Sequence, residues 1–205
     1  MRRSVLVLAA LSLQVAHSQE PSAKPILRIE TGTHTGPIRA IDADADERYL
    51  VSGSDDKTVR IWDLTSGKLL RVLRPPIGEG VVGRVQAVAI SPDGRTIACG
   101  AWTGSASEKM SIYLFERESG RLYRRIAGLP EIIVHLAYSP DGRFLVASMG
   151  GKNGIRLYRT VDYAPVSEDR DYGGESNGAD FAAASGSDLP NRLATSSNDG
   201  FLTTV

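Results

Sequence analysis

The chain has 205 residues, of which 41% are hydrophobic and 23% charged, and its 24 basic and 24 acidic residues balance to a net charge of zero. This composition excludes a disordered or fibrous protein, and the lack of a basic surplus argues against general nucleic-acid binding. The sequence contains one cysteine, Cys99, and three histidines. Neither an internal disulfide nor a zinc site of ordinary spacing is therefore expected.

The N-terminal 18 residues have the pattern of a secretory signal peptide. Two arginines precede an apolar run over residues 4–13, and small residues suited to cleavage follow at 16–18. The run is too short for a permanent membrane anchor, and no other run is long enough to span a bilayer. We therefore expect a signal peptide over 1–18, a linker over 19–24, and a protein exported to a bacterial periplasm or secreted.

The remainder of the chain repeats with a period of about 48 residues. The motif Ser-Pro-Asp-Gly-Arg occupies residues 91–95 and recurs at 139–143, a separation of 139 − 91 = 48. A degenerate copy lies at 44–48, and a fourth begins at Asn191. Each copy precedes an apolar run, and a fixed period of this length is typical of a repeat architecture.

Within each period, short runs rich in Val, Ile, Leu and aromatic residues are separated by turn-forming residues, and no helical periodicity is present. The predicted class is therefore all-β. The expected strands are 38–43, 49–52, 58–63 and 68–74; then 85–91, 96–100, 111–116 and 121–127; then 134–139, 144–149, 155–159 and 165–170; and finally 193–197 and 201–205.

A family resemblance rests on residues 52–63, which have the sequence Ser-Gly-Ser-Asp-Asp-Lys-Thr-Val-Arg-Ile-Trp-Asp. This segment resembles the end of a WD repeat, the four-stranded blade of a β-propeller, and Thr33-His34 stands where that family places Gly-His. The resemblance covers about residues 25–205. It implies blades over 34–74, 84–127, 131–170 and 176–205, the last one incomplete.

The same resemblance implies a structural hydrogen-bond network formed by His34, Ser52, Asp56 and Trp62. Such a network would satisfy polar hydrogens that are buried between sheets. The later repeats depart from the pattern. Trp62 aligns with Phe115, Tyr158 and Val205; Ser52 aligns with Cys99, Ala147 and Thr195; Asp56 aligns with Lys109, Lys152 and Asp199. The later blades are therefore expected to depend on apolar packing.

Three patterns imitate catalytic or ligand sites. His34, Ser52 and Asp56 are the residue types of a hydrolytic triad, but no nucleophile-elbow pattern surrounds the serine. Residues 78–83 spell G-x-G-x-x-G, but a strand follows instead of a helix, which predicts a flexible loop between blades. The acidic stretch 42–46 lacks the glycine and the closing glutamate of a calcium loop. We expect neither enzyme activity nor a metal or cofactor.

In the resembled family, loops at one end of the blades dock proteins or peptides. Here that rim would comprise the loops 77–84, 101–109, 149–153 and 172–177. The candidate partner-binding residues are Arg84, Trp102, Glu108, Lys109, Lys152 and Tyr172. Trp102 could bind a partner or fold over its own blade, and the sequence leaves both open.

The predicted function is a non-catalytic, exported interaction scaffold that binds a protein or peptide through this rim. The alternative is the propeller portion of a larger exported, caspase-like peptidase whose catalytic domain lies beyond Val205, because exported bacterial proteins with similar starts continue in that way. Propellers close with about four to eight blades, and residues 19–205 supply at most four. We therefore expect part of a larger ring, with residues 25–31 as a lone strand that would complete its final blade.

Overall fold

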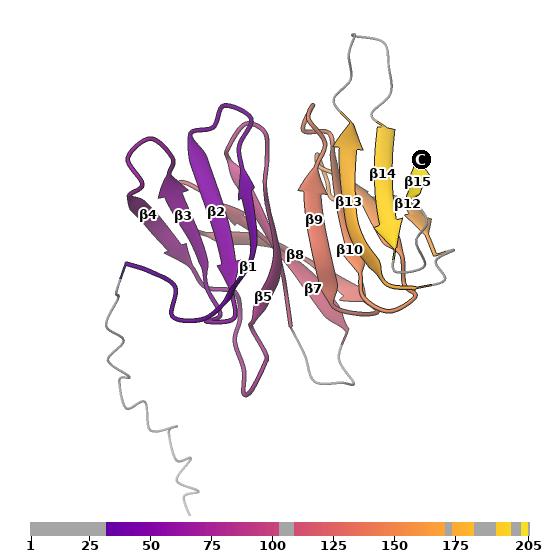
Figure 1. The fold of residues 1–205 in the computed structure, drawn as a ribbon, viewed down its shortest axis with the longest axis horizontal. Coiled ribbons are helices and arrows are strands. Elements are labelled where there is room, and N and C mark those ends of the chain that lie inside the picture. Colours follow the sequence, from indigo (N-terminus) through magenta and orange to yellow (C-terminus); the bar gives the residue numbers. More distant parts are fainter. Residues whose placement is uncertain (1–31, 103–108, 171–173, 183–191, 198–201, 205) are drawn as a thin grey trace, which may run out of the picture. The chain divides into compact units, whose positions relative to one another are not determined.

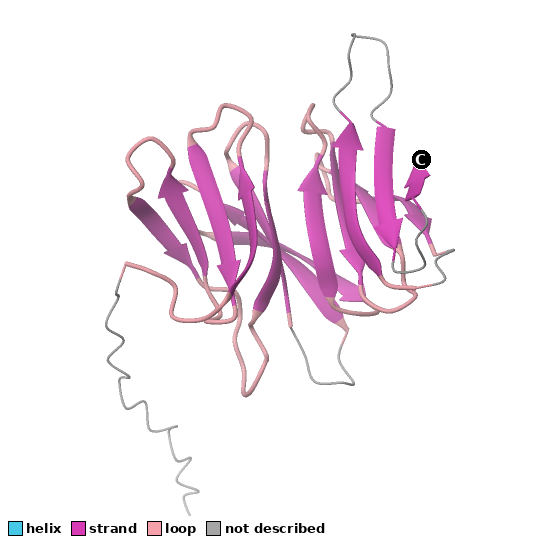
Figure 2. Ribbon diagram, in the orientation of Figure 1, coloured by secondary structure: helices cyan, strands magenta, loops and turns pink. Residues whose placement is uncertain are grey.

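The structure, a computed structural model, describes residues 32–102, 109–170, 174–182, 192–197 and 202–204. In this part of the chain every regular element is a β-strand, as Figure 2 shows. The all-β prediction is therefore confirmed. The described residues contain no helix that is long and apolar enough to cross a membrane.

The strands form four antiparallel sheets, called blades 1 to 4 (Figure 1). Blade 1 contains β1 (Ile38–Ala43), β2 (Tyr49–Ser54), β3 (Val59–Asp63) and β4 (Leu69–Leu73). Blade 2 contains β5 (Val85–Ile90), β6 (Thr96–Ala101), β7 (Met110–Glu116) and β8 (Leu122–Leu129). Blade 3 contains β9 (Ile133–Tyr138), β10 (Phe144–Met149), β11 (Ile155–Arg159) and β12 (Pro165–Asp169). Blade 4 contains β13 (Ser176–Ala182), β14 (Arg192–Ser197) and β15 (Leu202–Thr204).

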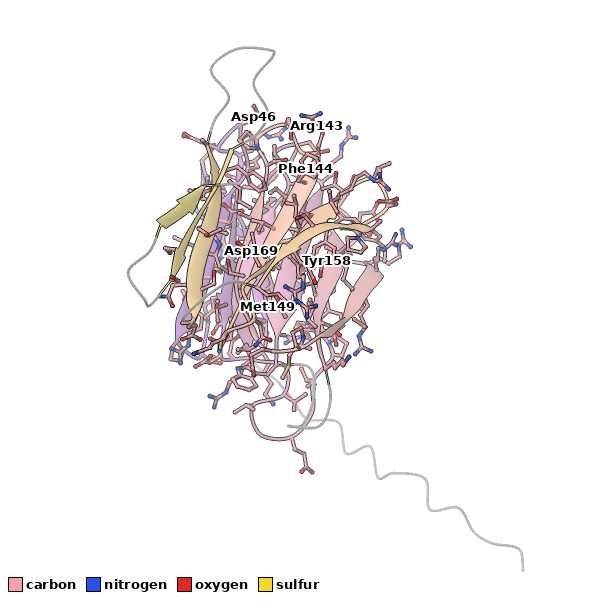
Figure 3. The ribbon with its side chains drawn as sticks, turned by 90° about the vertical axis from the view of Figure 1, so that its right-hand side faces the viewer. Asp46, Arg143, Phe144, Met149, Tyr158 and Asp169 are labelled. Atoms are coloured by element: carbon pink, nitrogen blue, oxygen red, sulfur yellow. The ribbon has the colours of Figure 1, made fainter. Side chains whose placement is uncertain are left out.

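Within each blade the strands are paired in chain order. The connections between β1 and β2 and between β3 and β4 therefore lie at one end of a blade. The connection between β2 and β3 and the segment leading to the next blade lie at the other end. Figure 3 shows this polarity in blade 3, with Arg143 and Phe144 at one end and Met149 at the other.

The repeated Ser-Pro-Asp-Gly-Arg motif forms the turn between the first two strands of blades 2 and 3. Ser91 Oγ donates a hydrogen bond to Asp93 Oδ1 over 2.6 Å and accepts one from the Thr96 amide. Gly94 adopts a φ of +70°, which favours glycine. In blade 1 the buried Asp44 replaces the serine and accepts hydrogen bonds from Arg48 and Tyr49. The acidic stretch thus runs from the end of β1 into this turn, and the described ranges contain no cluster of three or more His, Cys, Asp or Glu side chains placed to hold a metal ion.

Each blade buries its faces against its neighbours, so the core consists of three layers between blades. Val51, Ile61 and Val88 are in the cluster between blades 1 and 2. Ile112 and Leu145 are in the cluster between blades 2 and 3, and a third cluster joins blades 3 and 4. This nearest-neighbour burial is typical of repeat proteins.

The spacing of blades depends on glycine at one repeated position. A Cβ atom on Gly53 of β2 would lie 2.6 Å from Val85 Cγ1, and one on Gly100 of β6 would lie 2.6 Å from Ile133 Cβ. The position equivalent to Gly53 and Gly100 in blade 3 is occupied by Ser148, and the position equivalent to Val85 and Ile133 in blade 4 is occupied by Ser176. A glycine therefore lets the first strand of the next blade approach closely at the first two junctions.

The strand ranges expected from the sequence agree with the corresponding strands to within about two residues, but β13 (Ser176–Ala182) was not among the expected strands. The largest differences are the extensions of β2 to Ser54 and of β8 to Leu129. The G-x-G-x-x-G segment lies in a loop between β4 and β5, as predicted. The signal peptide, the linker and the expected strand over 25–31 lie outside the described residues.

Candidate functional site

The structure brings His34, Ser52, Asp56 and Trp62 together in blade 1. Trp62 Nε1 donates to Ser52 Oγ over 2.8 Å. His34 Nε2 lies 2.8 Å from Ser52 Oγ, and His34 Nδ1 lies 2.9 Å from Asp56 Oδ2. Thr58 also belongs to the group, because its Oγ1 donates to Asp56 Oδ1 over 2.6 Å. The sequence comparison with WD repeats did not single out Thr58.

One arrangement of hydrogens satisfies every donor in this network. Trp62 donates to Ser52, the Ser52 hydroxyl donates to His34 Nε2, and His34 Nδ1–H donates to the carboxylate. Burial raises the pKa of the Asp56 carboxyl, but hydrogen bonds from Thr58, His34 and the Thr35 amide outweigh burial and lower it overall. The ionised Asp56 carboxylate is therefore the final acceptor in this series of hydrogen bonds.

This geometry supports a structural network and not a catalytic triad. The side chains of His34 and Asp56 are 3% and 6% exposed, and Ser52 is 2% exposed. The serine oxygen already accepts the tryptophan N–H. A nucleophile must reach its substrate. These side chains are almost fully buried, so a substrate could not reach the serine.

Blades 2 and 3 have other residue types at the positions of the network. Leu50 is paired with Trp62, Ile97 with Phe115 and Leu145 with Tyr158, so these three aromatic residues are equivalent. Cys99 and Ala147 stand where blade 1 has Ser52, and both are fully buried. Burial raises the pKa of the Cys99 thiol to about 12. A thiol of that pKa is uncharged at neutral pH and is a poor nucleophile.

The loop 75–84 between blades 1 and 2, called the rim loop, combines internal hydrogen bonds with exposed apolar side chains. The loop is folded back on itself. The Gly78 amide donates to Val82 O over 3.2 Å, the Arg84 amide donates to Val81 O over 3.0 Å, and Lys57 Nζ donates to Gly78 O over 2.8 Å. Ile77 and Val81 are 53% and 41% exposed on this loop. The sequence placed Ile77 and Val81 within the rim without identifying either as an exposed apolar residue.

Trp102 supports the rim loop from the end of β6. The Gly83 amide donates to Trp102 O over 2.6 Å, and the Trp102 amide donates to Arg84 O over 3.1 Å. The Trp102 side chain is partly buried and packs against the cluster between blades 2 and 3. The structure thus buries part of this side chain against the layer between blades 2 and 3, and a partner-binding role for Trp102 stays a prediction.

Three of the other predicted rim residues, Arg84, Lys109 and Lys152, lie in the described part of the chain. Arg84 is partly exposed, and Lys109 and Lys152 are exposed. Glu108 and Tyr172 lie outside the described residues. The structure therefore brings Arg84 and Trp102 together.

His135, on β9, lines a cavity of about 560 Å³ between the first strands of the blades. Its Nδ1 atom is buried and has no hydrogen-bond partner among the described residues. Burial lowers the pKa of His135, although the nearby Asp180 carboxylate opposes this shift.

Comparisons with known proteins agree with the repeat architecture. Residues 25–63 and 67–107 match the family described as WD domain, G-beta repeat. The small ribosomal subunit protein RACK1y of rice (Oryza sativa subsp. japonica) is 39% identical over 100 residues, which cover 48% of this chain and 26% of the rice protein. A ribosome biogenesis protein BOP1 homolog of Drosophila persimilis is 38% identical over 72 residues, covering 35% of this chain and 8% of that protein.

Among solved structures, the crystal structure of RRP9 WD40 repeats has a TM-score of 0.67 and 19% sequence identity, covering 84% of this chain and 48% of that chain. The chain therefore contains WD40 repeats and has the fold of a WD40 β-propeller. It spans about a quarter of the rice protein, less than a tenth of the fly protein and about half of the RRP9 chain. Propellers of this type typically serve as scaffolds for protein–protein interactions.

Proposed function

We propose that this chain is an exported, non-catalytic interaction module that binds a protein or peptide through the rim loop and the neighbouring ends of the blades. The observation that carries the proposal is the exposure of Ile77 and Val81 on a loop held by its own hydrogen bonds. Exposed aliphatic side chains on an ordered loop lose little conformational entropy when a partner covers them.

The surroundings of the rim loop fit a protein partner better than a small molecule. Lys57 and Arg84 lie at the base of the loop, and Trp102 anchors it against the blade. Apolar side chains at the centre with charged groups around them are typical of protein interfaces. The partly buried Trp102 would then act by holding the loop in place.

The rim proposal can be tested by placing a photocrosslinking amino acid at position 81 in one protein and at position 161 in another. Val161 follows β11 at the opposite end of blade 3 and is 83% exposed, so it is a matched control. We expect position 81 to crosslink a specific partner that position 161 does not, and Ile77→Asp to abolish that crosslink. Equal crosslinking from both positions would contradict the proposal.

Trp102→Ala separates the two interpretations of the tryptophan. We expect a lower melting temperature, because the side chain packs against the cluster between blades 2 and 3. Restoring the fold at low temperature should restore the crosslink from position 81. If the variant folds at that temperature and the crosslink is still lost, Trp102 contacts the partner itself.

Export is the second part of the proposal and rests on the pattern of residues 1–18. We expect the mature protein in the exported fraction to begin at Gln19. N-terminal sequencing of protein from that fraction tests this, and recovery of the protein only in the cytoplasm with its first residues intact would contradict it.

A further inference from the structure

The outermost strand of blade 2 has the features of a docking strand. β8 has eight residues, whereas β4 and β12 have five each. In the described part of the chain β8 is paired with β7 and with no other strand, so one edge of its backbone is open. Most of its side chains are exposed. A Cβ atom on Gly128 would meet no atom within 4 Å, so the space beside that residue is open as well.

The side chains of β8 alternate between the two faces of blade 2. On β7, Tyr113 belongs to the cluster shared with blade 1, and Ile112 belongs to the cluster shared with blade 3. Tyr113 is paired with Arg125 and Ile112 is paired with Ile126. Because directly paired residues share a face, Arg125 is on the side of blade 1 and Ile126 is on the side of blade 3.

A hollow lies on each side of the open edge. The first, of about 540 Å³, is on the side of blade 1 and is lined by Pro76, Lys109, Tyr113 and Arg125 among others. The second, of about 480 Å³, is on the side of blade 3 and is lined by Ile126 and by Tyr158, which is labelled in Figure 3. Lys109, Ala127 and Gly128 border both hollows.

Both hollows carry an excess of positive charge. Among the described residues, the first contains Lys109 and Arg125 and no acidic residue. Arg125 Nε donates to Ser111 Oγ over 2.8 Å, which orients the guanidinium group. The one acidic residue among the described residues that line the second hollow, Glu168, already binds Arg156 and Arg170 over 2.9 Å each.

We propose that β8 binds an extended, acidic segment of a partner protein as a fifth strand of blade 2. The added strand would form main-chain hydrogen bonds with the open edge, and its side chains would enter the two hollows alternately. Acidic residues suit the hollow that contains Arg125 and Lys109, and apolar residues suit the hollow beside Ile126 and Tyr158. The site adjoins the rim loop at Pro76, which lines the first hollow, but neither Ile77 nor Val81 lines either hollow.

Arginines on an edge strand also have a simpler role, because they discourage unwanted pairing with other strands. That role requires the charges but not the two hollows that flank β8. The edge of blade 3 provides a contrast: β12 begins with Pro165, which lacks an amide hydrogen, and carries Glu168 and Asp169.

The test uses the purified 205-residue protein and a fluorescein-labelled peptide of ten residues that alternates valine and glutamate, with binding measured by fluorescence anisotropy. In a paired strand the N–H groups of every second residue face the neighbouring strand. Two further peptides are therefore made, one N-methylated at every glutamate and one at every valine. Arg125→Glu is the test variant, and Lys68→Glu beside β4 is its control because it changes charge equally at another exposed site.

We expect saturable binding of the parent peptide, loss of binding for one N-methylated peptide but not the other, and weakening of about tenfold or more in Arg125→Glu. Lys68→Glu should retain the affinity of the wild type. The proposal is overturned if the parent peptide does not bind, if the two N-methylated peptides bind equally, or if Lys68→Glu weakens binding as much as Arg125→Glu. The N-methylated peptides test the wild-type protein, so the result does not depend on how the variants fold.

Discussion

Replacing Asp56 with alanine is expected to destabilise blade 1 by about 3 kcal/mol. The change removes the carboxylate that accepts hydrogen bonds from His34, Thr58 and the Thr35 amide. The His34 donor is buried, and a buried donor without a partner costs about 1–3 kcal/mol. Thr58 Oγ1 loses its acceptor as well, whereas water can replace the bond to the exposed Thr35 amide. Relief from burying a charge offsets part of this loss.

Urea denaturation followed by circular dichroism measures this difference. The denaturant dependence should be the same for the wild type and Asp56→Ala, so that the midpoint shift reports stability alone. Asp56→Asn keeps one acceptor oxygen and should cost less than alanine. A loss smaller than about 1 kcal/mol in Asp56→Ala would show that the network is not a major source of stability, and our assignment of its role would be refuted.

The same carboxylate makes stability depend on pH. The pKa of Asp56 in the folded protein lies below its ordinary value of 3.8. Its contribution is therefore complete above that ordinary value and is lost as the pH falls through the folded-state pKa. The difference in stability between the wild type and Asp56→Asn should shrink as the pH decreases below about 4.

Three further predictions follow from the packing. Gly53→Ala should cost about 1–3 kcal/mol in urea denaturation, because the added methyl group overlaps Val85; an unchanged midpoint would refute this. Burial lowers the pKa of His135 below its ordinary value of 6.5, so stability should fall as the pH decreases from 6.5 through the folded-state pKa, and His135→Gln should remove that part of the dependence. Burial of Cys99 should protect it from N-ethylmaleimide until urea unfolds the protein, and rapid labelling of the native protein would contradict its placement.

The sequence predicted the repeat and most of the strands because these depend on local patterns, whereas the four-residue network was implied by the resemblance to WD repeats. A turn motif followed by an apolar run fixes where a strand begins, and the motif in residues 52–63 identified Ser52, Asp56 and Trp62. Thr58 was not identified as a network residue, because a threonine at the start of a strand has no distinctive pattern.

Features that depend on contacts between blades could not be predicted in the same way. Tyr123, Tyr138 and Tyr163 come from separate segments, yet the Tyr163 hydroxyl lies 3.2 Å from each of the other two hydroxyls. The hollows beside β8 likewise depend on how blades 1 and 3 sit against blade 2. The glycines of the rim loop predicted a loop but could not show that Lys57 and Trp102 hold it in place.

The close approach at Gly53 and Gly100 has a consequence for how such a chain can evolve. At two junctions a glycine faces a bulky residue of the next blade, and at the third both equivalent positions are serines, Ser148 and Ser176, whose hydroxyls are buried without hydrogen-bond partners among the described residues. A serine opposite Ile133 would overlap it, and a glycine opposite Ser176 would leave a void. The third junction is therefore not interchangeable with the first two, and a repeat moved to or from it would need a neighbour with the matching residue.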